Sequence, residues 1–194
     1  MNRFFCFYTA KTGYADEAER CAKSFKAFGV DVSRMSMLNK RNWMATCMAR
    51  CAVLQRLSFE YSDDGIGLLD SDLTCLRDPV LLKDFSGDVA VHDGGPGSPA
   101  CMRYSAGVLV FGATPRGRAC LDLWVKACRA DATPLEELRE QLYLKQAIEH
   151  SEAVVTHVGD AYNKHIDRYV KGDDTVILHH VASRKLKKTI GGAK

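Results

Sequence analysis

The stretch from Ile66 to Leu73 constrains the fold of this chain most strongly, because an apolar run ends there in two aspartates separated by one residue. A short apolar run bounded by a glycine and a turn is typical of a buried strand. Open α/β sheets bind their ligands beyond the carboxyl ends of such strands. Asp70 and Asp72 would repel each other there unless a cation lies between them or water screens them. A solvated turn is the alternative, since Asp and Ser are common turn residues.

The spacing of apolar side chains predicts that strands and helices alternate along the chain. The expected helices cover residues 15–28, which Gly29 ends, 43–59, 79–85, and two segments that open at Thr114-Pro115 and Thr133-Pro134. The expected strands cover residues 3–9, 30–37, the run that ends at Asp70, 88–92, 107–111, 154–158 and 176–179. This alternation predicts a three-layer α/β/α sandwich with a mostly parallel central sheet.

The composition is that of a globular protein, with 46% hydrophobic and 26% charged residues in a chain of 194, which is long enough for one complete core. No apolar run reaches the ~18 residues of a membrane-spanning helix. The N-terminal residues read as a first strand and not as a signal peptide. The eight cysteines include no Cys-x-x-Cys pair. We therefore expect a cytoplasmic protein.

Cysteines of this kind are usually small buried hydrophobes. Cys47 and Cys51 share a face of a predicted helix, so a metal held between them is an alternative.

Positive charge gathers at the C-terminus. The formal net charge is +3, and residues 184–194 carry five basic groups and no acid, so that taking these five charges away leaves −2 on residues 1–183. We expect one domain over residues 1–183 and a basic tail over residues 184–194. Such a tail suits a phosphorylated ligand or a polyanion, although a solvated tail is the commoner case.

Four elements stand in a characteristic order: Asp70-Ser71-Asp72 after a buried strand, the run Tyr104–Phe111, the segment Glu140–Leu144, and His179 near the end. Together they resemble a GT-A glycosyltransferase, and most closely the glycogenin-like glycosyltransferase family 8 and its nucleotide-diphospho-sugar transferase relatives. The resemblance runs from Thr9 to Lys185. It implies the GT-A form of the three-layer α/β/α sandwich.

The resemblance implies a metal site formed by Asp70, Asp72 and His179. Carboxylate oxygens suit Mg²⁺ or Mn²⁺, and an added imidazole favours Mn²⁺. Such a cation neutralises the departing diphosphate of a sugar nucleotide. The late family motif His-x-x-Gly-x-x-Lys fits better when it starts from His179, which gives Lys185 as its last residue, than when it starts from His180.

The resemblance also implies how a sugar nucleotide would lie in the site. The loop after the first strand binds the nucleoside, Arg50 contacts the donor phosphate or sugar, and Lys185 contacts the diphosphate. Gln141 would lie beside the anomeric carbon, and Glu140 would bind sugar hydroxyls or act as a base. The implied donor-side residues are Thr9, Ala10, Tyr14, Arg50, Ser71, Ser105, Gly107 and Lys185.

The reaction that the resemblance implies is hexosyl transfer from a nucleotide sugar, with a UDP-sugar as the default donor, to an acceptor hydroxyl with retention of configuration. Loop residues 94–99 and the neighbourhood of Asn163, His165 and Arg168 are expected on the acceptor side. The acceptor stays open between a glycan, a protein, a small molecule and a hydroxymethylated DNA base. The DNA base is suggested by the basic tail and by the basic residues of the segment 39–43.

Two other classes of function are compatible with these residues. A nucleotidyltransferase shares a nucleotide-binding α/β scaffold and metal-binding carboxylates. A non-catalytic module could bind a nucleotide sugar or a nucleic acid.

Overall fold

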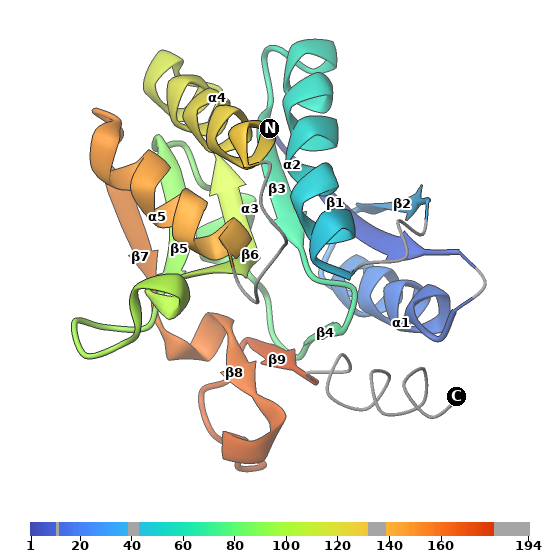
Figure 1. Ribbon diagram of the computed structural model, residues 1–194. Coiled ribbons are helices and arrows are strands. Elements are labelled where there is room, and N and C mark those ends of the chain that lie inside the picture. The colour runs from blue at the N-terminus through green and yellow to red at the C-terminus, as the bar shows by residue number, and fades with distance from the viewer. Residues whose placement is uncertain (11, 39–42, 132–138, 181–194) are drawn as a thin grey trace, which may run out of the picture.

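The computed structural model describes residues 1–10, 12–38, 43–131 and 139–180, which build a main sheet with strand order β2-β1-β3-β6-β5-β7 (Figure 1). Its strands are β1 (Asn2–Thr9), β2 (Val32–Met37), β3 (Gly65–Leu69), β5 (Val89–Asp93), β6 (Tyr104–Phe111) and β7 (Val155–Val158). Every predicted strand up to residue 158 is present, with ends that differ by up to three residues.

Five strands of the main sheet run in one direction and β6 runs against them. β1 pairs in parallel with β2 and β3, and β5 pairs in parallel with β7. β6 is antiparallel to both of its neighbours, β3 and β5. The sheet is therefore mostly parallel, as predicted.

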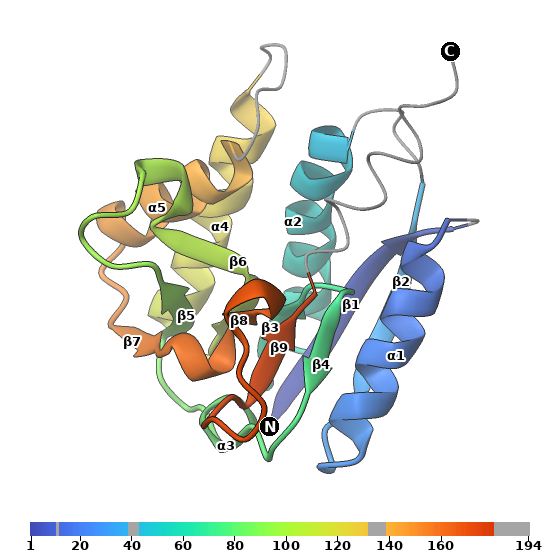
Figure 2. The same cartoon turned by 90° about the horizontal axis from the view of Figure 1, so that it is seen from below.

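Helices cover both faces of this sheet, which makes three layers (Figures 1 and 2). The helix α1 (Tyr14–Lys26) lies on one face, and α2 (Trp43–Glu60), α4 (Pro115–Ala130) and α5 (Arg139–His150) lie on the other. Short helices complete the connections: α3 (Val80–Lys83), η1 (Ala100–Met102), η2 (Asp160–Tyr162) and η3 (Ile166–Arg168). The predicted three-layer α/β architecture is confirmed.

Alternation along β1 divides the core into two halves, because successive side chains of a strand point to opposite faces. Phe4 and Cys6 pack in the half that contains α1, whereas Phe5 packs in the half that contains α2, α4 and α5. All five residues of β3 are buried, which explains its continuous apolar sequence.

The helix α4 begins as its sequence predicts. The Thr114 side chain accepts a hydrogen bond from the backbone N–H of Gly117 at 3.0 Å, and Pro115 occupies the first helical position. Gly29 follows α1 with a positive φ of 76°, a conformation that favours glycine. The predicted start of the next helix at Thr133-Pro134 lies outside the described residues, and α5 is described from Arg139.

A second, small sheet with strand order β4-β9-β8 lies beside the carboxyl end of β3. It contains β4 (Leu73–Cys75), β8 (Lys164–His165) and β9 (Ile177–His179). Only the last of these was expected from the sequence. Strands of two or three residues are too short to show a period, and for this reason β4 and β8 were missed.

The seven cysteines whose side chains the structure describes are buried thiols that form no disulfide, as expected from the sequence. The group of metal-ligating side chains found among the described residues contains no cysteine, so it does not support a metal between Cys47 and Cys51. Within the described ranges, none of the helices combines the length and apolar character needed to span a membrane. The basic tail at 184–194 lies outside these ranges, as does most of the segment 39–43.

Candidate active site at the carboxyl edge of the sheet

A cleft of about 850 Å³ opens at the edge of the main sheet where its parallel strands end. Thr9 is the last residue of β1, Asp70 follows the last residue of β3, and both line the cleft. Because β6 runs in the opposite direction, its N-terminal residues Ser105 and Gly107 reach the same edge. Ligands of open α/β sheets bind at this edge.

Asp70, Asp72 and His179 lie together in this cleft. Each offers one ligand atom, and these atoms lie within 4.8 Å of one another. His179 Nε2 is 3.2 Å from Asp72 Oδ1 and 3.9 Å from Asp70 Oδ2. The three residues that the resemblance assigns to a metal are therefore adjacent in the fold.

The small sheet explains how residue 179 meets residues 70 and 72. After β3 the chain turns, with the N–H of Leu73 donating to the carbonyl of Asp70 at 3.3 Å, and continues as β4. β4 pairs with β9 in antiparallel register, which sets His179 opposite Leu73. The backbone N–H of Asp70 donates to the carbonyl of Gly107 at 2.9 Å and ties the same turn to β6.

The imidazole of His179 is oriented from behind by Asn163, whose side chain is 5% exposed. His179 Nδ1 lies 3.0 Å from Asn163 Oδ1, and Asn163 Nδ2 donates to Ser105 Oγ at 3.2 Å. An amide that donates to Ser105 presents its oxygen to His179, so Nδ1 carries the proton and Nε2 faces Asp72. Metal-ligating histidines are commonly held in this way.

The adjacent His180 points away from the two aspartates. Its Nε2 lies 2.9 Å from Thr74 Oγ1, and its backbone N–H donates to the carbonyl of Asp72 at 3.0 Å. Consecutive residues of a strand face opposite sides, so His179 and His180 cannot both join the group.

Gly107 permits the close approach of these side chains. A Cβ at this position would lie 3.0 Å from Asp70 Oδ2 and 3.4 Å from His179 Cε1. These distances leave little room for a methyl group. A larger residue at position 107 would therefore displace the side chains of the group, whether or not a ligand is present.

The three side chains fit a divalent cation. Two carboxylates supply hard oxygen ligands, and one imidazole supplies nitrogen, a set suited to Mg²⁺ or Mn²⁺. Asp70 and Asp72 lie on one turn, and His179 lies on the strand paired with the residues that follow it. Because the two carboxylates repel each other, a cation bound between them would stabilise this arrangement.

Arg50 of α2 joins this group to α5. Its Nη1 donates to Asp70 Oδ1 at 2.6 Å, and its Nε and Nη2 donate to the two oxygens of Glu140 at 2.6 and 3.1 Å. Burial raises the pKa of Glu140 above its ordinary value, and the guanidinium of Arg50 opposes this rise in part. The two hydrogen bonds from Arg50 favour the charged carboxylate form of Glu140 and oppose the effect of its burial.

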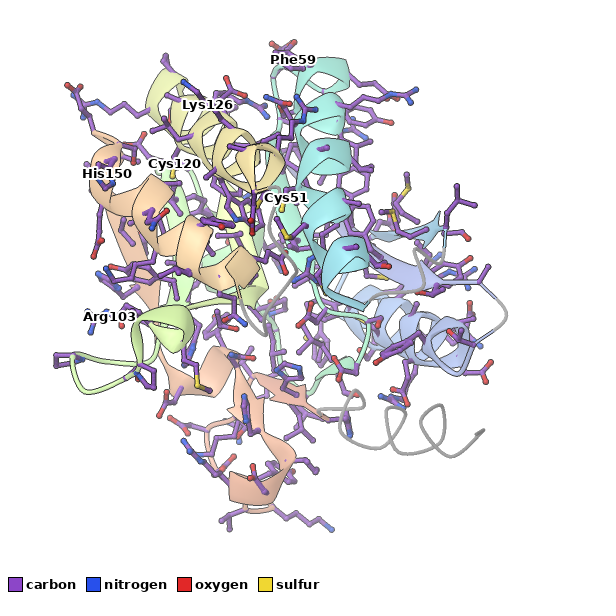
Figure 3. All side chains as sticks on the ribbon, in the orientation of Figure 1. Cys51, Phe59, Arg103, Cys120, Lys126 and His150 are labelled. Atoms are coloured by element: carbon purple, nitrogen blue, oxygen red, sulfur yellow. The ribbon has the colours of Figure 1, made fainter. Side chains whose placement is uncertain are left out.

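Glu140 is fixed in the core and is only 4% exposed. Trp124 Nε1 donates to its backbone carbonyl at 2.9 Å, and Cys51 Sγ lies 3.8 Å from its Oε1. Figure 3 labels Cys51 on α2, on the side that faces α4 and α5. With both oxygens accepting from Arg50, Glu140 is placed to position Arg50.

The other predicted site residues are distributed as follows. The cleft is lined by Thr9, Tyr14, Ser71, Ser105 and Gln141 as well as by the residues already described. Burial, followed by the nearby acidic side chains, raises the pKa of Tyr14 to about 12, so it keeps its phenol proton at neutral pH. Ala10 is exposed and does not line the cleft. Lys185 lies outside the described residues.

Several residues that line the cleft were not singled out in the sequence. His92, Asp160 and Lys164 lie at one end of it, and Phe7 and Tyr8 lie at the other. The aromatic residues follow from the expectation that β1 ends at the site. His92 is the penultimate residue of β5, so the same rule about strand ends would have found it.

No protein family matches this chain, and no curated protein matches it. Solved structures do. A glycosyltransferase involved in the glycosylation of the major capsid of PBCV-1 is similar with a TM-score of 0.67 and 14% identity, over 96% of this chain and 98% of that chain. GlyE of Streptococcus pneumoniae TIGR4 is similar with a TM-score of 0.56 and 14% identity, over 93% of this chain and 55% of that chain.

The bifunctional glycosyltransferase WbbM is similar with a TM-score of 0.60 and 11% identity, over 93% of this chain and 45% of that chain. This chain thus spans about half the length of the GlyE and WbbM chains. At such identities the likeness concerns the fold alone. The fold of this chain is one that glycosyltransferases use, as the sequence elements predict.

Proposed function

We propose that this chain is a metal-dependent glycosyltransferase that moves a hexosyl group from a nucleotide sugar to an acceptor hydroxyl. One observation carries the proposal: Asp70, Asp72 and His179 converge within 4.8 Å at the carboxyl edge of a sheet whose fold glycosyltransferases share. We assign residues 1–183 to the catalytic domain and 184–194 to a basic tail. Within the fold, we place the chain nearest to the glycogenin-like group.

The donor would lie with its nucleoside over the end of β1. Tyr8, Thr9 and Tyr14 line the cleft there and supply aromatic surface and hydroxyls. A UDP-sugar is the first choice of donor. The diphosphate would then reach Asp70, Asp72 and His179, where a bound Mn²⁺ or Mg²⁺ would neutralise its developing charge. Lys185 is assigned to the same diphosphate.

The transfer exchanges one bond at the anomeric carbon for another. The bond from this carbon to the diphosphate oxygen breaks, the acceptor oxygen forms the new bond, and the acceptor proton leaves with the diphosphate. We assign Gln141, which lines the cleft, to the position beside the anomeric carbon. We also propose retention, because the carboxylate of Glu140 is held by Arg50 and is not placed as a base for inversion. Proton NMR of the first-formed glycoside tests this point, and the opposite anomer would refute it.

The experiment that tests the proposed function is release of nucleoside diphosphate from a panel of nucleotide sugars, with Mn²⁺ or with EDTA. Parallel wells receive plain DNA or DNA with hydroxymethylated bases, which is one of the candidate acceptors. Metal-dependent release that Asp72→Asn abolishes is the expected result. Full activity of Asp72→Asn would contradict the site. Absence of release from every donor would favour a nucleotidyltransferase or a binding module.

A further inference from the structure

The cleft has two chemically different ends, and Asp70, Asp72 and His179 lie between them. One end is aromatic and lies over β1. The opposite end, which we call the distal end, is formed by His92, Asp160, Lys164, His165 and Arg168 together with five residues of the following connection, which are Gly94, Gly97, Ser98, Pro99 and Met102. The sheet order explains this division, because β1 and β5 lie on opposite sides of β3 and β6.

The cations that line the cleft differ in what they contact. Among the described residues these cations are Arg50, Lys164 and Arg168. Arg50 is fully engaged by Asp70 and Glu140. Neither Lys164 nor Arg168 forms an ion pair of 4 Å or less with any residue that the structure describes. The carboxylate of Asp160 is 80% exposed and contacts His92 Nε2 at 3.0 Å. This contact lowers the pKa of Asp160, and the charges of Lys164 and Arg168 help to lower it from beyond ion-pair distance.

The backbone that carries the two distal cations is attached to the candidate metal group. In β8, Lys164 pairs with Leu178 and His165 pairs with His179, and the rings of His165 and His179 lie edge to face with centroids 5.2 Å apart. Arg168 ends the helical turn that follows directly. The segment is anchored through Asn163, which contacts both His179 and Ser105.

These cations are not needed for the donor. Its diphosphate would be neutralised at Asp70, Asp72 and His179, and its nucleoside would lie at the other end. Two cations without ion pairs at the distal end therefore face the acceptor. A neutral glycan offers them no counter-charge, whereas a phosphate accepts charge-assisted hydrogen bonds from both Lys and Arg.

We propose that the distal end binds a phosphate group carried by the acceptor, through Lys164 and Arg168. The inference rests on the proposed function, because it takes the distal end to be the acceptor end. A free nucleotide, a nucleic-acid strand and a phosphorylated sugar share this chemistry, and the arms of the experiment separate them.

The experiment measures binding by calorimetry, with UDP and Mn²⁺ present to fill the aromatic end. The probes are 5-hydroxymethyldeoxycytidine with and without a 5′-phosphate, glucose with and without a 6-phosphate, and an oligonucleotide that contains the hydroxymethylated base. The proteins are the wild type, the double variant Lys164→Gln/Arg168→Gln, and Lys171→Gln. Lys171 is an exposed lysine of the same segment that does not line the cleft.

We expect at least one phosphorylated probe to bind about tenfold or more tightly than its unphosphorylated partner, because its phosphate can accept charge-assisted hydrogen bonds from both side chains. The double variant should lose this gain and Lys171→Gln should keep it. Preference for the oligonucleotide would identify a nucleic acid, and preference for a monomer would identify a small acceptor. Equal binding of every matched pair, or a gain that survives in the double variant, would overturn the inference.

Failure of the inference and failure of the proposed function give different results. Metal-dependent donor hydrolysis without acceptor, together with no effect of phosphate on binding, retains the glycosyltransferase and removes the phosphate site. Phosphate-dependent binding at Lys164 and Arg168 without hydrolysis of any donor retains the site and removes the glycosyltransferase.

Discussion

Arg50 Nη1 lies 2.6 Å from Asp70 Oδ1, so a cation with a side chain only 13% exposed contacts one of the three side chains that we assign to a metal. The same guanidinium forms two hydrogen bonds to Glu140 on a different helix. Arg50 therefore holds the carboxylate of Asp70, and the position of Arg50 itself depends on Glu140, which lies 90 positions away in the sequence.

Replacing Arg50 by Met should destabilise the fold by about 3–5 kcal/mol, because it leaves the buried Glu140 carboxylate without its partner. Chemical denaturation monitored by circular dichroism measures this loss. Arg56→Met is the matched control, since Arg56 is an exposed residue of the same helix. The double variant Arg50→Met/Glu140→Leu should recover most of the stability, because a buried ion pair can be replaced by apolar groups at little cost. A loss for Arg50→Met no larger than that for Arg56→Met would contradict this account.

Asn163 should act as a positioning residue for His179. Asn163→Leu removes the oxygen that accepts from Nδ1, so the imidazole loses its orientation and Mn²⁺ affinity should fall about 10–100-fold. Titration of Mn²⁺ followed by electron paramagnetic resonance measures the affinity without any substrate. Asn163→Asp keeps an oxygen at this place and should bind Mn²⁺ more tightly than Asn163→Leu. Equal affinities in wild type and Asn163→Leu would show that His179 does not depend on Asn163.

Gly107→Ala should weaken metal binding while the protein stays folded. The added methyl would lie 3.0 Å from Asp70 Oδ2 and 3.3 Å from Ser105 Oγ, so the carboxylate must move. We expect roughly tenfold weaker Mn²⁺ binding in the same titration, which is comparable to the effect of removing a residue that hydrogen-bonds a metal ligand. Gly159→Ala serves as the control, because a Cβ there meets nothing within 4 Å and its φ is −71°. Unchanged affinity in Gly107→Ala would mean that the group has more room than the distances indicate.

The stability of the fold should fall in acid through Asp88. Hydrogen bonds from Thr114 Oγ1 at 2.6 Å and from the N–H of Val154 at 2.9 Å hold the pKa of Asp88 below its usual value. A carboxyl with a lowered pKa contributes stability above its unfolded pKa of 3.8, and this contribution is lost as the pH falls through the lower folded pKa.

Asp88→Ala should therefore cost about 1 kcal/mol at pH 7, a figure that allows for screening by solvent. Part of the difference from wild type should disappear below pH 3. Denaturation curves at pH 7, 5, 4 and 3 give the comparison, with exposed Asp31→Ala as the control. A difference that does not change between pH 7 and pH 3 would exclude a contribution from the charge of Asp88.

The parts of the site that lie on long elements could be predicted from the sequence. The strand ending at Asp70 and the helix carrying Arg50 show clear apolar patterns over many residues, and the Thr-Pro pair fixes the start of α4. The direction of β6 could not be predicted, because buried parallel and buried antiparallel strands have the same apolar sequence pattern.

The contacts between distant segments that form the site were harder to predict from the sequence. His179 meets Asp72 through strands of three residues, which carry no periodic signal, so only the resemblance to a family indicated it. The pairing of Arg50 with Glu140 joins two helices that are distant in sequence, and nothing local in either helix indicates it. Asn163 was expected near the acceptor, whereas in the fold its side chain contacts His179.

The reversed direction of β6 has a consequence for how such a protein can change. Residues 94–103 connect β5 to β6, and because β6 starts at the carboxyl edge, this connection begins and ends at that edge, where five of its residues line the cleft. The labelled Arg103 in Figure 3 marks its end, where the guanidinium holds Asp93 at 2.8 Å. A different loop grafted between Asp93 and Tyr104 would reshape one wall of the cleft without shifting the strands that carry Asp70 and Gly107. The fold thus keeps a connection that can be exchanged apart from the strands that position the candidate metal group.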